Sequence, residues 1–540
     1  MTSKQSRPCQ HLGHSRQSVS RITSDTAVPS IGPFVAALRL HIEGTNRRHP
    51  QALASAQSRG WLMTDQQLEG HTFRKTLRWY DGFMMALPIG SGLFVSVGYM
   101  MGTIGVIPAT IACALLSVVA ILQNKLFSEM AAMFPTKAGG VALFAAEAWK
   151  RYFSPIAPIA AFGYWCGWGL SLALTGITMG SLVGAQWFPE ATDAYFTVAG
   201  VGFGLAQAIG VVTVVLCSVL NIAGIRVAVR VNQVIGAVFI VILALLLVLP
   251  LASSSWSTEN LTSGPTTDWK TFAVWLFVVA WAIYGTELCA IFAPEYVDTS
   301  KDTSRALTSV GLFMLMVYTV IPIATGGQLG SETIAANPIT YGVASIAEFS
   351  PFLSEITTAV LCGAIFLIMI SASADAGRAL YGISNEGMSL RQLDLLNSRG
   401  VPSRAIWVTM VINLLMIVFV GNPVAILIAS NIGYILAVTL AVFGFLLLRK
   451  DRPGLVRPIR LGKPWLVVAG VVGAFDAFIL AMGAFNPDLS HAGGTKEVLV
   501  GIGILLIGFV LFVVRRVLQD RQPFTLRERD EDVSAEVTNV

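Results

Sequence analysis

Twelve apolar runs, nearly free of charged residues, follow one another along most of this 540-residue chain. A helix needs about 20 apolar residues to cross the hydrocarbon core of a bilayer, and most of the runs reach that length. Because hydrocarbon offers no water to backbone polar groups, such runs are expected to cross as helices. The sequence therefore predicts an all-α polytopic membrane protein with twelve transmembrane helices, at residues 82–102, 103–124, 153–186, 195–222, 231–252, 271–294, 306–330, 356–377, 405–420, 424–448, 464–485 and 498–514.

The composition excludes a string of soluble domains. Only 12% of the residues are charged and 54% are hydrophobic, whereas an ordinary soluble domain has about 25% charged residues. The net charge of +5 does not indicate a nucleic-acid partner, because the basic residues are spread between the apolar runs. All six His lie outside the runs and five of the six Cys lie inside them, so we expect no cofactor, metal site or disulfide framework. The runs also supply no nucleophile–base–acid set, which argues against an enzyme.

The chain divides into three parts. Residues 1–78 are polar and contain no apolar stretch of the kind that a signal peptide requires. Residues 79–516 carry the spans, and residues 517–540 form a charged tail. Met63 opens a short polar leader before the first span, so residues 1–62 are either a disordered cytoplasmic tail or sequence upstream of the true start. The sequence leaves both explanations open.

Lys and Arg alternate between the loops. They are frequent in the loops that join spans 2–3, 4–5, 6–7, 8–9 and 10–11, whereas the other loops hold only Lys270 and Lys496. The positive-inside rule then places both termini in the cytoplasm, which requires an even number of spans and agrees with twelve. We expect a multi-pass protein of the plasma membrane surrounded by lipid bilayer, with its oligomeric state left open.

Two spans contain residues that break helices. In the first, Pro88 precedes Gly90-Ser91-Gly92 in mid-span, and in the sixth, Gly285 and Glu287 interrupt the apolar run. Close packing of helices through small residues explains one such span taken alone. Paired interruptions at corresponding positions of two halves instead predict a substrate site between discontinuous helices.

The two interruptions offer complementary groups to a zwitterion. The amides at the first break would bind a carboxylate, since helix N-termini are positive ends, and the carbonyls at the second would accept from an ammonium group. We also expect Trp281 to act as a gate or a stacking surface, and leave Tyr164 open between substrate contact and packing. The predicted substrate-binding residues are Ile89, Gly90, Ser91, Gly92, Leu93, Tyr164, Trp281, Ala282, Ile283, Tyr284 and Gly285.

Five motifs resemble those of the amino acid–polyamine–organocation transporters, in the right order over about residues 75–515. They are Gly90-Ser91-Gly92-Leu93-Phe94, Ser128-Glu129-Met130 with Pro135 and Gly139-Gly140, Asn221 with Gly224, Gly285-Thr286-Glu287 with Pro294-Glu295, and Arg378 with Glu386-Gly387. The resemblance implies a five-plus-five inverted repeat with discontinuous helices 1 and 6, and two peripheral helices, 11 and 12. No residue-by-residue identity between the halves is visible, so the repeat is inferred from the resemblance alone.

Carboxylates inside the spans are candidates for ion coupling, because a charge at mid-span is costly and usually functional. Glu287 beside the second break is the first candidate for proton coupling, with a purely structural carboxyl as the alternative. Asp375 is the second, with an intrahelical pair to Arg378 as its alternative. The resemblance implies that Ser371 and Ser373 could imitate the hydroxyls of a sodium site, although sodium is the less favoured ion. Span 5 lacks the lysine that some proton-coupled members of the family carry.

Two further carboxylates are given structural roles. Glu129 follows Lys125 by four residues, so we expect a surface ion pair on one helix. Asp476 lies in span 11, where the resemblance implies a peripheral position and we expect packing or an interface.

These observations together predict a secondary active transporter of amino acids or related amines that works by alternating access, with proton-coupled symport or exchange. Two alternatives stay open: a channel, and a substrate sensor of the same fold that transports nothing. Two broken spans with few charges along a pore favour the transporter over the channel.

Overall fold

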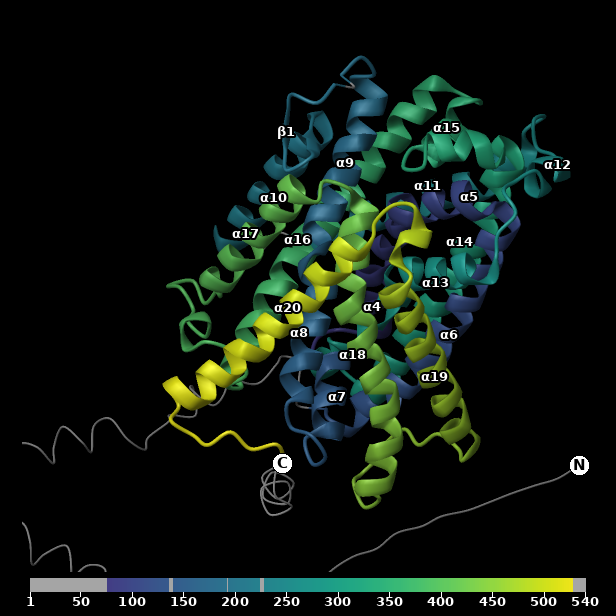
Figure 1. The fold of residues 1–540 in the computed structure, drawn as a ribbon. Coiled ribbons are helices and arrows are strands. Elements are labelled where there is room, and N and C mark those ends of the chain that lie inside the picture. Colours follow the sequence, from purple (N-terminus) through teal and green to yellow (C-terminus); the bar gives the residue numbers. More distant parts are fainter. Residues whose placement is uncertain (1–74, 136–138, 192, 224–227, 528–540) are drawn as a thin grey trace, which may run out of the picture. The chain divides into compact units, whose positions relative to one another are not determined.

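The computed structural model describes residues 75–527, apart from 136–138, 192 and 224–227. The question of a start at Met63 therefore lies outside the described residues. Helices make up nearly all of the described chain (Figure 1). The α-helices are α4 (Trp79–Ala86), α5 (Gly98–Ile104), α6 (Val106–Met133), α7 (Gly140–Trp149), α8 (Ile156–Gly169), α9 (Ser171–Trp187), α10 (Leu205–Ala223), α11 (Ala228–Val248), α12 (Thr258–Thr262), α13 (Trp269–Tyr284), α14 (Thr299–Ala336), α15 (Tyr341–Ala347), α16 (Pro351–Asn385), α17 (Ser403–Phe419), α18 (Pro423–Asp451), α19 (Pro464–Phe485) and α20 (Thr495–Val514).

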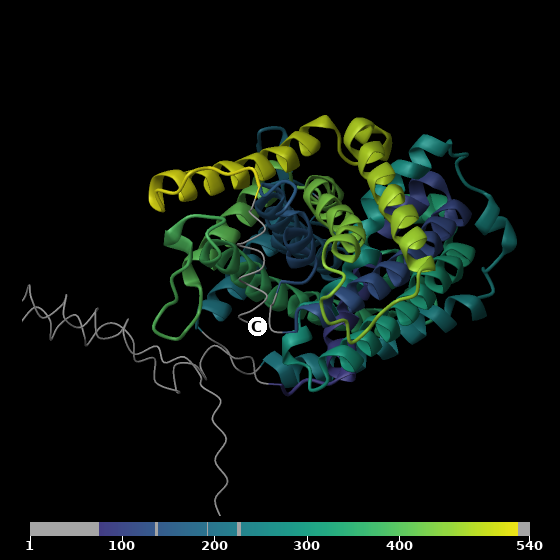
Figure 2. The same cartoon turned by 90° about the horizontal axis from the view of Figure 1, so that it is seen from below.

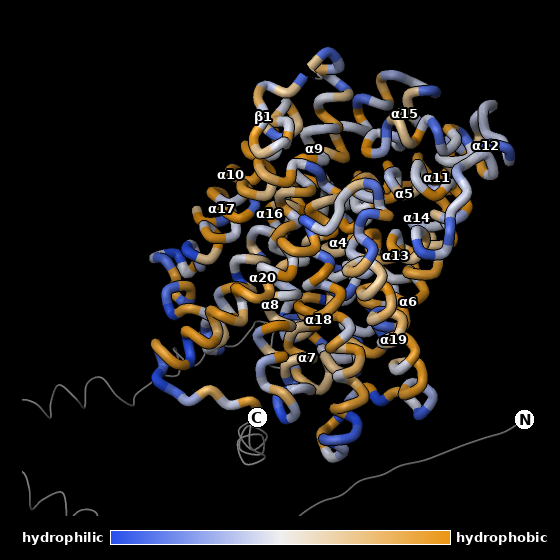
Figure 3. Tube along the Cα trace, in the orientation of Figure 1, coloured by the Kyte–Doolittle hydropathy of each residue, from blue (hydrophilic) through white to orange (hydrophobic). Residues whose placement is uncertain are grey.

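Ten helical stretches of the described chain are long and apolar enough to cross a membrane. Hydrophobic residues predominate along the middle of the bundle and hydrophilic ones gather at its two ends (Figure 3). The remaining two expected runs, 231–252 and 405–420, fall on α11 and α17, whose apolar parts, Gly236–Ala252 and Ser403–Phe419, are shorter. An all-α polytopic membrane protein is therefore confirmed, and the count of twelve spans stays a prediction.

The helices begin and end where local chemistry favours it. The turn expected between the ninth and tenth runs is present: Asn422 caps α18 by accepting from the amides of Val424 and Ala425, and Pro423 fills the first helical position. Gly421 before it has a φ of 67°, which glycine adopts without strain. Asp268 and Ser350 cap α13 and α16 in the same manner.

One expected helical stretch is a β-hairpin instead. Residues 195–222 form α10 only from Leu205, and the strands β1 (Phe196–Val198) and β2 (Val201–Phe203) precede it. Ala199 and Gly200 between them both have positive φ, which closes a two-residue hairpin turn of the kind that matches strand twist. Phe196 and Phe203 pair across the hairpin with ring centroids 4.7 Å apart. Apolarity alone could not separate this short ribbon from the helix that follows it.

The central helices differ from the outer ones in burial. The most apolar part of α13 is 83% buried, against 33% for α19 and α20. α20 crosses the front of the bundle in Figure 1 and lies at its margin in the view from below (Figure 2). Inside, α8 and α18 approach so closely that a Cβ on Gly163 would lie 2.5 Å from the carbonyl oxygen of Gly433. The core thus surrounds α13 and brings it against the first interrupted span.

Candidate functional site

The first span keeps a helical course but contains two segments that are not α-helical. After α4 come a 3₁₀ segment, η1 (Leu87–Ser91), and a π segment, η2 (Leu93–Val97), before α5. The backbone at Leu87, Gly92 and Gly98 stays in the right-handed helical region. The expected interruption is therefore present at the expected residues, but as a change of hydrogen-bond spacing and not as an unwound stretch. Such 3₁₀ and π segments inside helices often occur at functional positions.

The second interruption lies at the end of α13. The α-helix stops at Tyr284, and a 3₁₀ segment, η4 (Gly285–Ala290), continues the chain. The two interruptions touch: a Cβ on Gly92 would lie 2.8 Å from the Cβ of Ala282, and one on Gly285 would lie 3.2 Å from Ile89. The glycines at both breaks therefore permit a close approach of the two spans.

A tyrosine from α14 lies between the two breaks. The hydroxyl of Tyr318 is 3.1 Å from the carbonyl oxygen of Ile89 and 2.9 Å from that of Ala282. One hydroxyl proton can serve only one of these acceptors at a time. The carbonyl of Ala282, expected to accept from a substrate, is thus already engaged by Tyr318.

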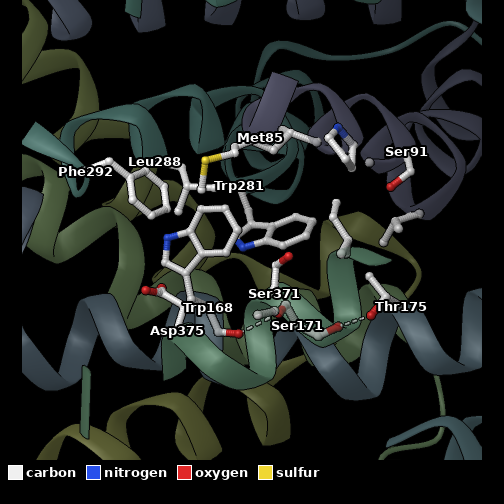
Figure 4. A pocket seen from close by; sticks show the side chains of 16 residues that line it. Met85, Ser91, Trp168, Ser171, Thr175, Trp281, Leu288, Phe292, Ser371 and Asp375 are labelled. Carbon is white, nitrogen blue, oxygen red and sulfur yellow. Dashed lines mark hydrogen bonds between the residues drawn. The ribbon is translucent and has the colours of Figure 1, made fainter. Parts of the chain in front are cut away.

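A cavity of about 70 Å³ opens beside this contact (Figure 4). A water molecule needs roughly 10–15 Å³ of such space, so the cavity has room for about five waters. Its wall comes from both interrupted spans and from α8, α9 and α16. The lining residues are Met85, Pro88, Ile89, Ser91, Gly92, Val95, Trp168, Ser171, Thr175, Trp281, Leu288, Phe292, Ile368, Ser371, Ala372 and Asp375.

The cavity brings together some of the residues predicted from sequence and not others. Ile89, Ser91, Gly92, Trp281, Ser371 and Asp375 line it. The other predicted residues do not line it: Gly90, Leu93, Tyr164, Ala282, Ile283, Tyr284, Gly285, Glu287 and Ser373. Ser373 is buried and its hydroxyl has no hydrogen-bond partner, although Ser371 two residues earlier is exposed to the cavity.

Two tryptophans form one wall of the cavity. The rings of Trp168 and Trp281 lie side by side in Figure 4, with centroids 6.0 Å apart. The indole nitrogen of Trp281 donates to the carbonyl of Gly167 at 3.0 Å, which fixes the ring against α8. Trp168 was missed from sequence, yet it follows Tyr164 by four residues and so shares its helix face.

Glu287 is buried behind this wall, with 2% of its surface exposed. Its Oε1 accepts from the hydroxyl of Tyr164 at 3.2 Å and from the indole nitrogen of Trp168 at 3.4 Å. The hydroxyl of Tyr434 on α18 lies close enough to the same carboxyl to interact with it electrostatically. The indole of Trp168 therefore contacts both the cavity and the buried carboxyl.

Among the described residues, Asp375 is the only charged one on the wall of the cavity. Its carboxylate has no hydrogen bond or ion pair within the described residues, and Arg378 acts on it only through electrostatic attraction. The expected alternative, an ion pair with Arg378, is not formed. Asp375 and Ser371 stand one turn apart on α16 and both lie at the cavity in Figure 4.

The expectation for Glu129 is wrong. The side chain is completely buried and pairs with Arg449 at 2.6 Å and Arg457 at 3.3 Å, both C-terminal to it by more than 300 residues. Lys125, its expected partner, donates to Thr308 instead. A carboxylate with no exposure needs compensating charge, and here that charge comes from the chain around the end of α18.

A helical bundle with two interrupted spans packed around a small, mostly apolar cavity belongs to the class of multi-pass membrane transporters. The sequence matches the amino acid permease family over residues 82–511, and the chain belongs to that family. The resemblance to the amino acid–polyamine–organocation transporters is thereby confirmed.

Three curated proteins illustrate the similarity. The chain is 22% identical over 489 residues to the amino-acid permease RocE of Bacillus subtilis (strain 168), covering 85% of this chain and 98% of RocE. It is 24% identical over 349 residues to the lysine-specific permease LysP of Escherichia coli (strain K12), covering 60% of this chain and 66% of LysP. It is 24% identical over 256 residues to the D-serine/D-alanine/glycine transporter of Escherichia coli O6:H1, covering 43% of this chain and 52% of that transporter.

Proposed function

We propose that the protein is a secondary active transporter that carries amino acids or related amines across the membrane by alternating access. The observation that carries this proposal is the cavity at the contact of the two interrupted spans, with hydroxyls and one carboxylate on an otherwise apolar wall. The family and its amino acid permeases support the same substrate class.

We further propose the topology that the sequence predicts. Twelve spans, with α11 and α17 completing the ten longer ones, form a five-plus-five inverted repeat with α19 and α20 outside it. Both termini lie in the cytoplasm, and the protein resides in the plasma membrane. The low burial of α19 and α20 supports their place at the periphery.

The substrate sits between the two breaks. Its carboxylate approaches the backbone at Ser91 and Gly92, and its ammonium group approaches Asp375 and Ser371 across the cavity. The part of the chain that the structure describes places no cationic side chain on the wall, so the carboxylate of Asp375 also favours substrates with a positive side chain or a co-bound cation. Proton coupling involves Glu287. Its carboxyl does not line the cavity, but it accepts a hydrogen bond from the indole of Trp168, which does. Sodium at Asp375, Ser371 and Ser373 is the less favoured alternative.

Counterflow in proteoliposomes tests the proposal. Vesicles loaded with unlabelled lysine, arginine, ornithine, alanine or serine are diluted into trace label of the same compound. A transporter accelerates label entry through exchange, a channel does not, and a sensor moves none. Asp375→Asn is expected to reduce counterflow of the cationic substrates more than that of the neutral ones. Absence of counterflow for every amino acid and amine, with binding retained in a thermal-shift assay, would favour the sensor.

A further inference from the structure

One carboxylate outside the cavity is left without a role in transport. Asp476 lies on α19, most of which is exposed at the outside of the bundle, yet the residue itself is completely buried. It belongs to a single buried stripe on that helix, whose other members are small or apolar: Ala469, Val472, Gly473, Ile479, Met482 and Gly483. An apolar side chain would pack in such a stripe without the cost of burying a carboxyl group.

Three hydrogen bonds hold the Asp476 carboxylate. The amide nitrogen of Gln123, from α6, donates to both oxygens, at 3.1 and 2.9 Å. The hydroxyl of Tyr284, the last residue of α13, donates to Oδ1 at 2.9 Å. No Lys, Arg or His pairs with Asp476 within the described residues. The carboxylate therefore joins α19 to two central helices through neutral donors only.

The bond from Tyr284 lies directly beside the second interruption. Tyr284 is directly followed by Gly285, where the hydrogen-bond spacing changes from α to 3₁₀. The residue after Gln123, Asn124, donates to the hydroxyl of Thr286 at 3.0 Å on the other side of the change. Tyr284 and Thr286 are thus fixed from outside the helix, and Asp476 is the acceptor for the first of them.

We propose that Asp476 is a positioning residue: through Tyr284 and Gln123 it holds the end of α13, and so sets the geometry of the second interruption from the peripheral span. The role rests on the proposed transport function, because the geometry of the second interruption matters only if substrate binds beside it. Asp476 acts on the candidate site indirectly, since neither Asp476 nor Tyr284 lines the cavity. It also gives α19 a function beyond contact with lipid.

Two variants test the anchor. Asp476→Asn keeps the size of the side chain but replaces one acceptor oxygen with a donor, and Tyr284→Phe removes the hydroxyl alone. Each is expected to lower the maximal rate of counterflow at least about tenfold while KM changes by less than about threefold, because the cavity wall is untouched. The double variant should lose less than the two single variants added together, because both variants disturb the Tyr284–Asp476 bond. Tyr341→Phe is the matched control, because that buried hydroxyl has no hydrogen-bond partner.

Hydrogen exchange gives a readout that does not depend on transport. The amides of residues 285–290 should exchange at least about tenfold faster in both variants than in the wild type, and unchanged in Tyr341→Phe. Exchange and counterflow at wild-type values in Tyr284→Phe, or additive losses in the double variant, would overturn the proposal. If the wild type moves no amino acid, the proposed function fails, and the exchange of residues 285–290 still decides whether Asp476 fixes the break. Should Asp476→Asn fail to fold, Tyr284→Phe carries the test alone.

Discussion

At the scale of single residues, the site depends on the absence of a side chain at Gly92. A Cβ there would lie 2.8 Å from both the Cβ of Ala282 and the hydroxyl of Tyr318, closer than such atoms approach. The glycine thus permits the contact between the two spans and also lines the cavity. Of the two explanations open for the Gly-Ser-Gly sequence, close packing is observed at Gly92, and substrate binding at the same residue is our proposal.

Gly92→Val is expected to abolish counterflow while membrane insertion continues. The extra methyl groups must push α13 away, and overpacking of this kind costs about 1–3 kcal/mol. Gly503→Val on α20 is the control, because nothing lies within 4 Å of a Cβ at that position. The measurement is counterflow at equal amounts of monodisperse protein, and wild-type counterflow in Gly92→Val would contradict the expectation.

Glu287→Gln tests proton coupling, because it keeps the shape of the side chain and removes its titration. The hydroxyl of Tyr164 and the indole of Trp168 can still donate to the amide oxygen. The variant should lose the pH dependence of uptake and its accumulation against a gradient, and keep pH-independent exchange. Uptake and counterflow between pH 5 and pH 8 show the difference. An active variant with an unchanged pH profile would move the coupling site to Asp375.

The sequence predicts the residues of the breaks better than the residues opposite them. Pro88, Gly92 and Gly285 can be recognised in the sequence, because Pro and Gly weaken a helix whatever surrounds them. Trp168 and Ser171 have no such property. They lie on helices that are apolar and buried on nearly every side, so no stripe in the sequence indicates which face meets the cavity.

At the scale of elements, Tyr318 links the two interrupted spans through α14. Both acceptors of its hydroxyl are backbone carbonyls close to the interruptions: that of Ile89 lies within η1, and that of Ala282 lies two residues before the end of α13. The hydroxyl is therefore a shared partner for two elements that alternating access would move relative to each other.

Tyr318→Phe is expected to weaken this link without disturbing the packing of the ring. Loss of one buried hydrogen bond should lower the free energy of unfolding by about 1 kcal/mol. If the shared bond holds the two spans in one arrangement, the counterflow rate should also change relative to the wild type. Thermal unfolding in detergent and counterflow give the two values, with Tyr341→Phe as the control. A variant identical to the wild type in both would show that the bond is dispensable.

The positions of the helices were more predictable than their boundaries, since α14 (Thr299–Ala336) extends well beyond the apolar run at 306–330. α19 begins and ends at residues 464 and 485, as the apolar run does. The hairpin before α10 was not predicted, because its strands are as apolar as a span and only the positive φ of Ala199 and Gly200 separates them from a helix. The 3₁₀ and π segments that follow Ala86 also could not be predicted from a Pro and two Gly.

At the scale of the whole molecule, the segment after α20 folds back against the bundle. Asp520 pairs with Arg391 at 2.6 Å and with Arg515 at 2.8 Å. Farther along, the carbonyls of Thr525 and Leu526 accept from the hydroxyl and the amide of Ser154, just before α8. Residues 515–527 thus connect the loop after α16 with the start of α8.

Asp520→Asn is expected to release this segment. The guanidinium groups of Arg515 and Arg391 hold the pKa of Asp520 below its ordinary value. A lowered pKa means that the stabilisation is present above the ordinary pKa and is lost as pH falls through the lowered one. At pH 7 the variant should therefore be cleaved by trypsin after Arg521 faster than the wild type, with cleavage mapped by mass spectrometry. Lys496→Gln is the control, because that side chain bonds to Phe419 at a different end of the bundle.

The partners of buried charges at this scale could not be read from the sequence. Spacing along one helix suggested Lys125 for Glu129, whereas the partners lie about three hundred residues later. Local spacing predicts neighbours within an element. Contacts across the molecule depend on how the helices pack, which the pattern of apolar runs leaves undetermined.

The Glu129 ion pairs also determine when, during synthesis of the chain, the contact between α6 and α18 can form. The carboxylate precedes Arg449 by 320 residues, which a ribosome takes about 16 to 64 seconds to add at roughly 5–20 residues per second. Throughout that interval the end of α6 carries a charge whose partners do not yet exist, so it must stay in contact with water or with the insertion machinery. The α6–α18 contact therefore forms late. In a nascent chain truncated before Arg449, a cysteine that replaces Ser128, directly before the retained Glu129, should be accessible to aqueous reagents.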